Sequence, residues 1–151
     1  MRAINHVLTG ALIGFVVVEP VAAIPLAVAS HYVCDVIPHH GYTTNKNKQL
    51  RTTAFRNSLY IDAALCFGLV LILATSQPVH WLLAGVCAFA AAAPDLLSIN
   101  HYLKVLARKS WRPNLYSRFA TGIQWFERPV GAVVEVAWLI AAVSLLQPFI
   151  F

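Results

Sequence analysis

The stretch that decides the fold reads TAFRNSLYIDAALCFGLVLILAT and runs from Thr53 to Thr75. Its only charged side chains are those of Arg56 and Asp62. About 20 mostly apolar residues in a helix cross the hydrocarbon core of a bilayer. Gln77-Pro78 follows after Ser76 and provides a turn signal. The stretch therefore predicts a membrane-spanning helix.

Four further apolar segments surround this one. They run from Ala3 to Val18, from Val21 to Ile37, from His80 to Ile99 and from Pro129 to Leu146. The first two are separated by Glu19-Pro20, and each gives only about 24 Å of helix, so both a steep crossing and a re-entrant hairpin are open to them. We expect an all-α integral membrane bundle of about five apolar helices, forming a single transmembrane domain over residues 1–151.

The composition agrees with a membrane protein. The 151 residues are 59% hydrophobic and 11% charged, whereas soluble domains average about 25% charged residues. The net charge of +5 is explained by basic loops beside spanning helices, so we expect no nucleic-acid partner. Cys34, Cys66 and Cys87 lie in apolar stretches without CxxC spacing, which indicates small buried residues.

The first thirty residues have features of a secretory signal. Arg2 precedes an apolar run from Val7 to Val18, and Ala27-Val28-Ala29 imitates a cleavage site. We expect this segment to be retained as part of the fold.

The distribution of basic residues predicts the orientation. If five segments alternate, all eleven Lys and Arg residues fall on one side. They are Arg2; Lys46, Lys48, Arg51 and Arg56; and Lys104, Arg108, Lys109, Arg112, Arg118 and Arg128. The positive-inside rule then makes that side, and the N-terminus, cytoplasmic. We expect a multi-pass protein of the inner (plasma) membrane with membrane lipids as partners.

A polar stretch from Asn100 to Glu127 contains an amphipathic pattern. Its apolar stripe is formed by Leu115, Phe119, Ile123 and Phe126, flanked by Trp111 and Trp125 as candidate interfacial anchors. We expect an amphipathic helix along the inner membrane surface. A basic loop without regular structure is the alternative.

Ionisable side chains inside a bilayer are costly and often mark function. With the expected topology, only Glu19 and His80 among the six acids and six histidines are external. The others fall in the cytoplasmic half or at its mouth: His6, His31, His39, His40, His101, Asp35, Asp62, Asp95, Glu127 and Glu135. They could share one site.

The sharpest pair is His31 with Asp35, because a histidine and a carboxylate at i and i+4 share a helix face and suit Zn, Fe or Mn. His6 and Asp95 would complete a set of two nitrogens and two oxygens. Such a set can bind a divalent metal, Zn first among them, and activate water, with Glu127 or Glu135 as candidate catalytic general base. The alternative is that these groups pair only to satisfy one another.

Several segments together resemble a known family. They are Asn5-His6 with Thr9-Gly10, the HxxxDxxPH element from His31 to His39, Pro94-Asp95, and the stretch from Ile123 to Pro129 with Gly131 and Glu135. The chain resembles the small membrane-bound, predicted metal-dependent hydrolases of bacterial and archaeal inner membranes. The resemblance implies His6, His31, Asp35 and Asp95 as metal ligands and His39 at the pocket mouth. Many relatives continue Pro-Asp with a second aspartate and a histidine, whereas Leu96, Leu97 and Ser98 follow here.

Three functions follow as hypotheses. The first is a membrane-embedded, metal-dependent hydrolase that acts on a lipid-like or phosphoester substrate from the cytoplasmic leaflet. The second is a non-catalytic accessory subunit of a larger membrane complex, which packs a partner or a second copy on the GxxxG face of Gly10 and Gly14. The third, a proton conduit or small transporter, ranks last because the outer half holds only Glu19 and His80.

Overall fold

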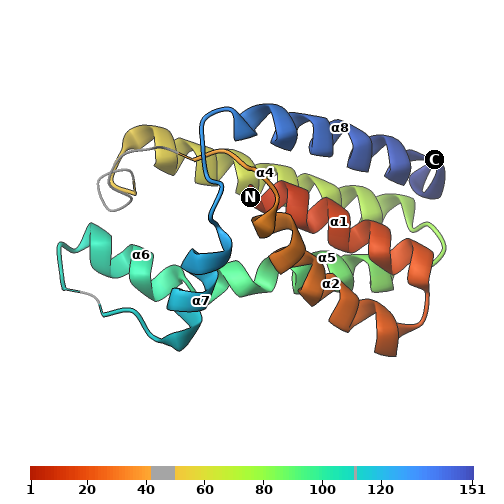
Figure 1. Cartoon of the computed structure of the whole chain (residues 1–151). Coiled ribbons are helices and arrows are strands. Elements are labelled where there is room, and N and C mark those ends of the chain that lie inside the picture. Colours follow the sequence, from red (N-terminus) through yellow and green to blue (C-terminus); the bar gives the residue numbers. More distant parts are fainter. Residues whose placement is uncertain (42–49, 111) are drawn as a thin grey trace.

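The computed structural model describes residues 1–41, 50–110 and 112–151, and within these residues the regular elements are seven helices (Figure 1). The helices are α1 (Ala3–Val17), α2 (Pro20–Val36), α4 (Thr53–Ser76), α5 (Trp81–Leu96), α6 (Ile99–Leu106), α7 (Leu115–Ile123) and α8 (Gly131–Ile150). The expected all-α helical bundle is confirmed.

The apolar segments become helices close to their expected bounds, and the differences lie at prolines. The fourth segment ends as a helix at Leu96, and α6 continues from it at an angle of 43°. Pro94 lacks the N–H that would bond to the preceding turn, which weakens the helix just before this bend. Pro129 lies two residues before α8 rather than in its first turn.

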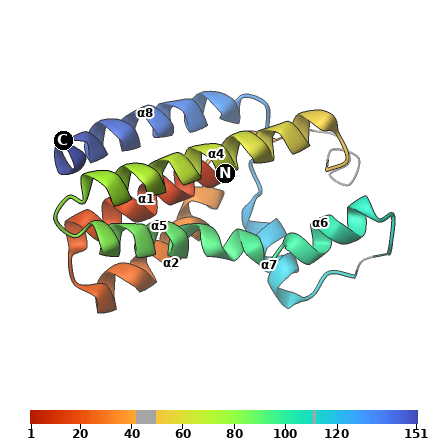
Figure 2. The same ribbon diagram turned by 180° about the vertical axis from the view of Figure 1, so that it is seen from behind.

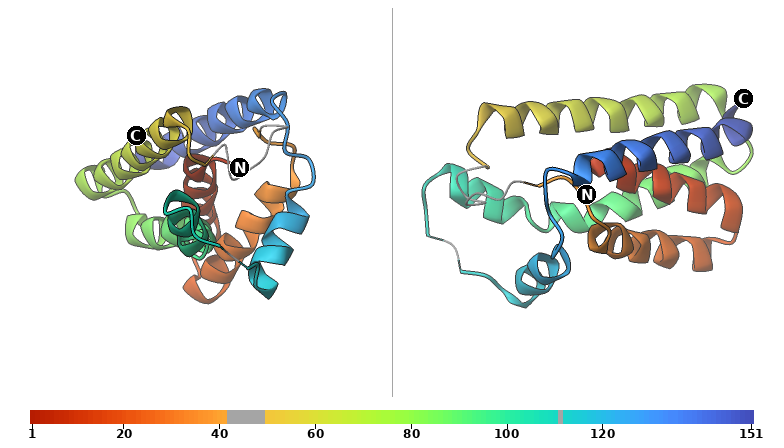
Figure 3. Two further views of the ribbon diagram at one scale, coloured as in Figure 1. Left: turned by 90° about the vertical axis from the view of Figure 1, so that its left-hand side faces the viewer. Right: turned by 45° about the horizontal axis from the view of Figure 1, so that its top comes forward.

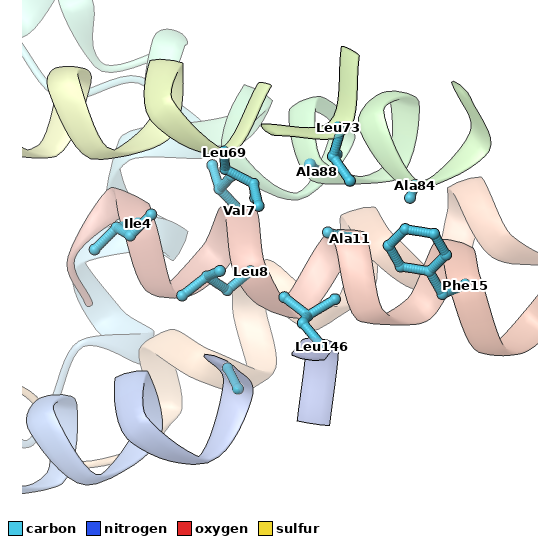
Figure 4. Packing of buried hydrophobic residues seen from close by; sticks show 11 residues of the cluster. Ile4, Val7, Leu8, Ala11, Phe15, Leu69, Leu73, Ala84, Ala88 and Leu146 are labelled. Atoms are coloured by element: carbon cyan, nitrogen blue, oxygen red, sulfur yellow. The ribbon is translucent and has the colours of Figure 1, made fainter. Parts of the chain in front are cut away.

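Helix α1 is the centre of the bundle. Its side chains pack against α5 and α4 on one side and α8 on the other, as Figure 4 shows for Val7, Leu8 and Leu146. Seen from behind in Figure 2, α5 and α2 cover the remaining face of α1. Helix α1 therefore packs against four other helices, α2, α4, α5 and α8.

Glycines allow α1 and α5 to approach closely. A Cβ on Gly14 would lie 2.6 Å from the Cα of Ala84, and one on Gly10 would meet the carbonyl group of Cys87. This is the close approach that small residues permit between apolar helices. The face of Gly10 and Gly14, which the sequence offered to a partner or a second copy, is therefore occupied within the chain by α5.

Two helices, α4 and α8, are long and apolar enough to cross a membrane, and the bent pair of α5 and α6 would make a third. Both α4 and α8 expose large apolar side chains, including Phe67 at 62% and Ile140 at 61%. Helices α1 and α2 are apolar but shorter, with 15 and 17 residues. The expected count of five spanning helices is therefore not reached by length.

The amphipathic region forms two short helices instead of one. α6 and α7 are both amphipathic, and α7 contains Leu115, Phe119 and Ile123 of the expected stripe. Phe126 follows the end of α7, so the stripe does not continue along one helix. Trp111, Lys46 and Lys48 lie outside the described residues.

The direction of the helices gathers the polar residues. In Figures 1 and 3, α1, α4 and α8 start at one end of the bundle, and α2 and α5 finish there. Consequently His6, Asp62 and Glu135, which lie early in their helices, share that end with Asp35 and Asp95, which lie late in theirs. The convergence expected from the sequence is present in the fold.

Candidate metal centre

Three helices contribute the core of the candidate site. His6 on α1, His31 on α2 and Asp95 on α5 each offer one ligand atom, and these atoms lie within 4.8 Å of one another. His6 and His31 are buried, whereas the side chain of Asp95 is 47% exposed. The group is therefore closed by the bundle on the histidine side and open at Asp95.

Asp35 lies beside both histidines. Its Oδ1 is 3.3 Å from Nε2 of His6, and its Oδ2 is 3.4 Å from Nε2 of His31 one helical turn earlier. Nε2 of His31 is also 3.8 Å from Oδ1 of Asp95. The four residues that the sequence selected as ligands are thus brought together.

The orientation of His31 suits metal binding. Its Nδ1 lies 2.8 Å from the carbonyl oxygen of Ala91 on α5. A carbonyl oxygen only accepts hydrogen bonds, so in the neutral ring Nδ1 carries the proton and Nε2 presents a lone pair. Histidine ligands usually have such a partner on the second nitrogen, which fixes the ring and its tautomer. The lone pair points to the two carboxylates, where a cation would be stabilised.

The ring nitrogens of His6 lack hydrogen-bond partners among the described residues. The residue is fully buried, and neither ring nitrogen has a hydrogen-bond partner of good geometry among the described residues. Buried polar groups without partners are rare in folded proteins, and a bound ion is one way to satisfy them. The ring nitrogens of His6 and the carboxylates of Asp35 and Asp95 fit the donor set of Zn²⁺, or of Mn²⁺ and Fe²⁺.

Two groups that the sequence analysis did not identify form hydrogen bonds to the carboxylate of Asp35. Nε2 of Gln124 donates to Oδ2 at 3.1 Å, and the α-amino group of Met1 donates to Oδ1 at 2.6 Å. Gln124 directly follows α7, so it links the amphipathic region to the site. Its single polar side chain in a segment without metal-ligand spacing gave no signal in the sequence.

A second unselected group lies at the open side. The hydroxyl of Tyr116 donates to the carbonyl oxygen of Pro94 at 2.9 Å, next to Asp95. Burial, followed by the neighbouring Tyr32, raises the pKa of Tyr116 to about 12, so this hydroxyl stays protonated at neutral pH. Tyr32 also meets His31 edge to face at 5.3 Å and Phe119 at 5.5 Å. α7 is thereby docked beside the site.

The two candidate general bases lie apart from the histidines. The side chain of Glu127 packs against Gly41, and its backbone pairs with His39 in a single parallel bridge. Oε1 of Glu135 accepts the backbone N–H of Arg2 at 2.9 Å, on the face of α1 next to α8. Neither residue belongs to the group of His6, His31 and Asp95.

His39 and Asp62 lie outside the candidate metal group. His39 is buried, and its Nδ1 donates to the carbonyl oxygen of Ile37 at 2.8 Å. Burial, followed by the nearby ammonium group of Met1, lowers the pKa of His39 and keeps it neutral. Asp62 pairs with Arg2, at 3.0 Å from Nε to Oδ1. Neither His39 nor Asp62 belongs to the candidate metal group found in the described residues.

Comparison with protein-family models, curated proteins and solved structures gives no match for this chain. The geometry of the site therefore carries the functional argument by itself.

Proposed function

We propose that the protein is a membrane-embedded metal-dependent hydrolase with a divalent metal, Zn²⁺ first, at His6, His31, Asp35 and Asp95. The observation that carries the proposal is the approach of two buried histidines and two carboxylates from three helices, with ligand atoms of His6, His31 and Asp95 inside 4.8 Å. The resemblance to the small inner-membrane hydrolases assigns the same four residues. Its HxxxDxxPH element corresponds to His31 and Asp35 in the site and His39 behind it.

The chemistry assigned to the site is addition of water across an ester or phosphoester bond. A bound divalent ion would lower the pKa of water and polarise the scissile group. His31 is fixed by Ala91, and Asp35 by Gln124, so both are oriented before substrate binds. Asp95 is exposed and marks the side from which water and substrate enter.

Placement in a membrane is part of the proposal. The apolar outward faces of α4 and α8 are suited to lipid, and the basic residues favour a cytoplasmic position for the end that holds the site. Substrate would then reach Asp95 from the inner leaflet. A lipid-like or phosphoester substrate fits this position.

The test is hydrolysis by purified protein in bilayer nanodiscs. Phosphatidic acid and a fatty acyl ester are supplied separately, with Zn²⁺ or Mn²⁺ added. We expect metal-dependent turnover of one class and its loss in His31→Ala, while His80→Asn, at the far end of α5, retains it. Equal product release by wild type and His31→Ala, with either substrate and either metal, would reject a hydrolase centred on these residues.

A further inference from the structure

A cavity of about 280 Å³ lies between α1, α4 and α8. Its walls are apolar and come from α1, α4 and α8: Ile4, Leu65, Ala132, Val136 and Leu139. α4 and α8 both pack on α1 but make few contacts with each other. We call this space the α4/α8 groove.

One end of the α4/α8 groove is polar. Arg2, Asn5, His40 and Glu135 line it there. Nδ2 of Asn5 donates to the backbone carbonyl of Glu135 at 3.1 Å, which fixes the amide so that Oδ1 is its acceptor. Asn5 is 1% exposed, and Oδ1 has no hydrogen-bond partner among the described residues. This buried acceptor needs a donor that the described chain does not supply.

The carboxylate of Glu135 is a second hydrogen-bond acceptor at this end of the groove. The residue is 5% exposed, and its Oε1 already accepts the N–H of Arg2. Two nitrogens of the Arg2 guanidinium are engaged with α4, because Nε pairs with Asp62 and one amino group donates to the carbonyl of Ser58. Beside the imidazole of His40, the polar end therefore offers two buried acceptors, the amide oxygen of Asn5 and the carboxylate of Glu135, which suit a hydroxyl or an amide N–H.

The α4/α8 groove runs from a polar end to an apolar part, as a lipid does from its head group to its chain within one leaflet of a bilayer. Its polar end is at the starts of α1 and α8, and Leu139 lies one turn beyond Glu135 toward the middle of α8. The two helices beside its opening, α4 and α8, are those long and apolar enough to cross a membrane. A ligand can thus place its head at Asn5 and its chain among apolar side chains.

We propose that the α4/α8 groove binds a single-chain amphiphile whose head carries a hydrogen-bond donor, with that donor on Asn5 Oδ1 and the chain along Leu65, Val136 and Leu139. The volume is near the lower end of ligand pockets, about 300 to 1,000 Å³, so the head and the first part of the chain are enclosed. The proposal stands independently of the metal centre, because none of the candidate ligands lines this groove.

The test is photolabelling of the full chain in nanodiscs. The probe is hexadecanol with a diazirine close to its hydroxyl, and the matched probe is its methyl ether, which has the same chain but no donor. We expect saturable labelling of peptides from α4 and α8 by the alcohol, displaced by excess hexadecanol. The ether should label about fivefold less, as expected for the loss of one net hydrogen bond of about 1 kcal/mol.

Two variants separate the head from the chain. Asn5→Ala should reduce labelling by the alcohol to the level of the ether, whereas Ala132→Phe should block both probes by filling the groove. Val133→Phe, beside it on α8 but 70% exposed and outside the groove, is the matched control and should label as wild type does. Equal labelling by alcohol and ether in the wild type, or unsaturable labelling of all peptides, would overturn the proposal. Metal content is not a readout, so failure of the hydrolase proposal is distinguishable.

Discussion

The imidazole rings of His6 and His31 stack with their centroids 4.1 Å apart and their planes 25° from parallel, although they come from different helices. Both rings direct Nε2 toward the carboxylate of Asp35. Two stacked imidazoles in a buried position gain little from each other and cannot both be charged at low cost. The metal ion that we propose at this site would lie between the rings and the carboxylates and would stabilise this arrangement.

Gln124 should act as a positioning residue for the metal. Gln124→Ala removes the hydrogen bond to Oδ2 of Asp35, and loss of such a support typically weakens metal affinity about tenfold or more. The dissociation constant for Zn²⁺, measured by competition with a chromogenic chelator, checks this. Gln147→Ala, exposed near the end of α8, is the control, and an equal effect of both changes would show that Gln124 has no special role.

The contact between α1 and α5 should depend on the absence of a side chain at Gly14. Gly14→Ala places a methyl group against the backbone of Ala84, and such overpacking costs about 1–3 kcal/mol of unfolding free energy. Thermal unfolding in detergent measures it. Gly68→Ala on α4 meets open space and should leave the midpoint unchanged or raise it. If both variants unfold at the same temperature, the close approach is not as described.

The ion pair of Arg2 with Asp62 should matter mainly because Asp62 is buried. Arg2→Ala leaves a carboxylate with 7% residue exposure without its charged partner, which we expect to cost about 1–3 kcal/mol. Adding Asp62→Leu should recover most of that loss, because the uncompensated buried charge is then removed. Unfolding midpoints of the two variants give the comparison. A double variant less stable than Arg2→Ala alone would contradict it.

The sequence predicted the helices well where the apolar pattern is continuous. Thr53 to Thr75 became α4 within one residue, because the long apolar run contains no proline and its one glycine, Gly68, does not interrupt it. The sequence did not predict the bend after Pro94, where α5 ends and α6 begins. The prediction of a single amphipathic helix was wrong, because the region forms α6 and α7. Turns between polar short helices depend on tertiary contacts such as that of Tyr116 with Pro94, which no periodicity reports.

The sequence predicted which residues gather at the candidate site, but not the contacts that support them. His31 and Asp35 share a helix face by spacing, and costly polar groups within apolar helices single out His6 and Asp95. The contacts of His31 with the carbonyl of Ala91 and of Asp35 with the amide of Gln124 depend on how helices cross, which residue types do not reveal. The GxxxG face pointed to a close helix contact but not to α5 as its partner.

The most direct test of the central claim is metal content. Elemental analysis is applied to protein purified without chelator, then loaded with Zn²⁺ and desalted, for wild type, His31→Ala and the His80→Asn control. We predict about one equivalent of Zn²⁺ per chain in wild type and His80→Asn, and loss of nearly all of it in folded His31→Ala. No bound metal in the wild type, or the same content in His31→Ala, would contradict a metal centre at His6, His31, Asp35 and Asp95.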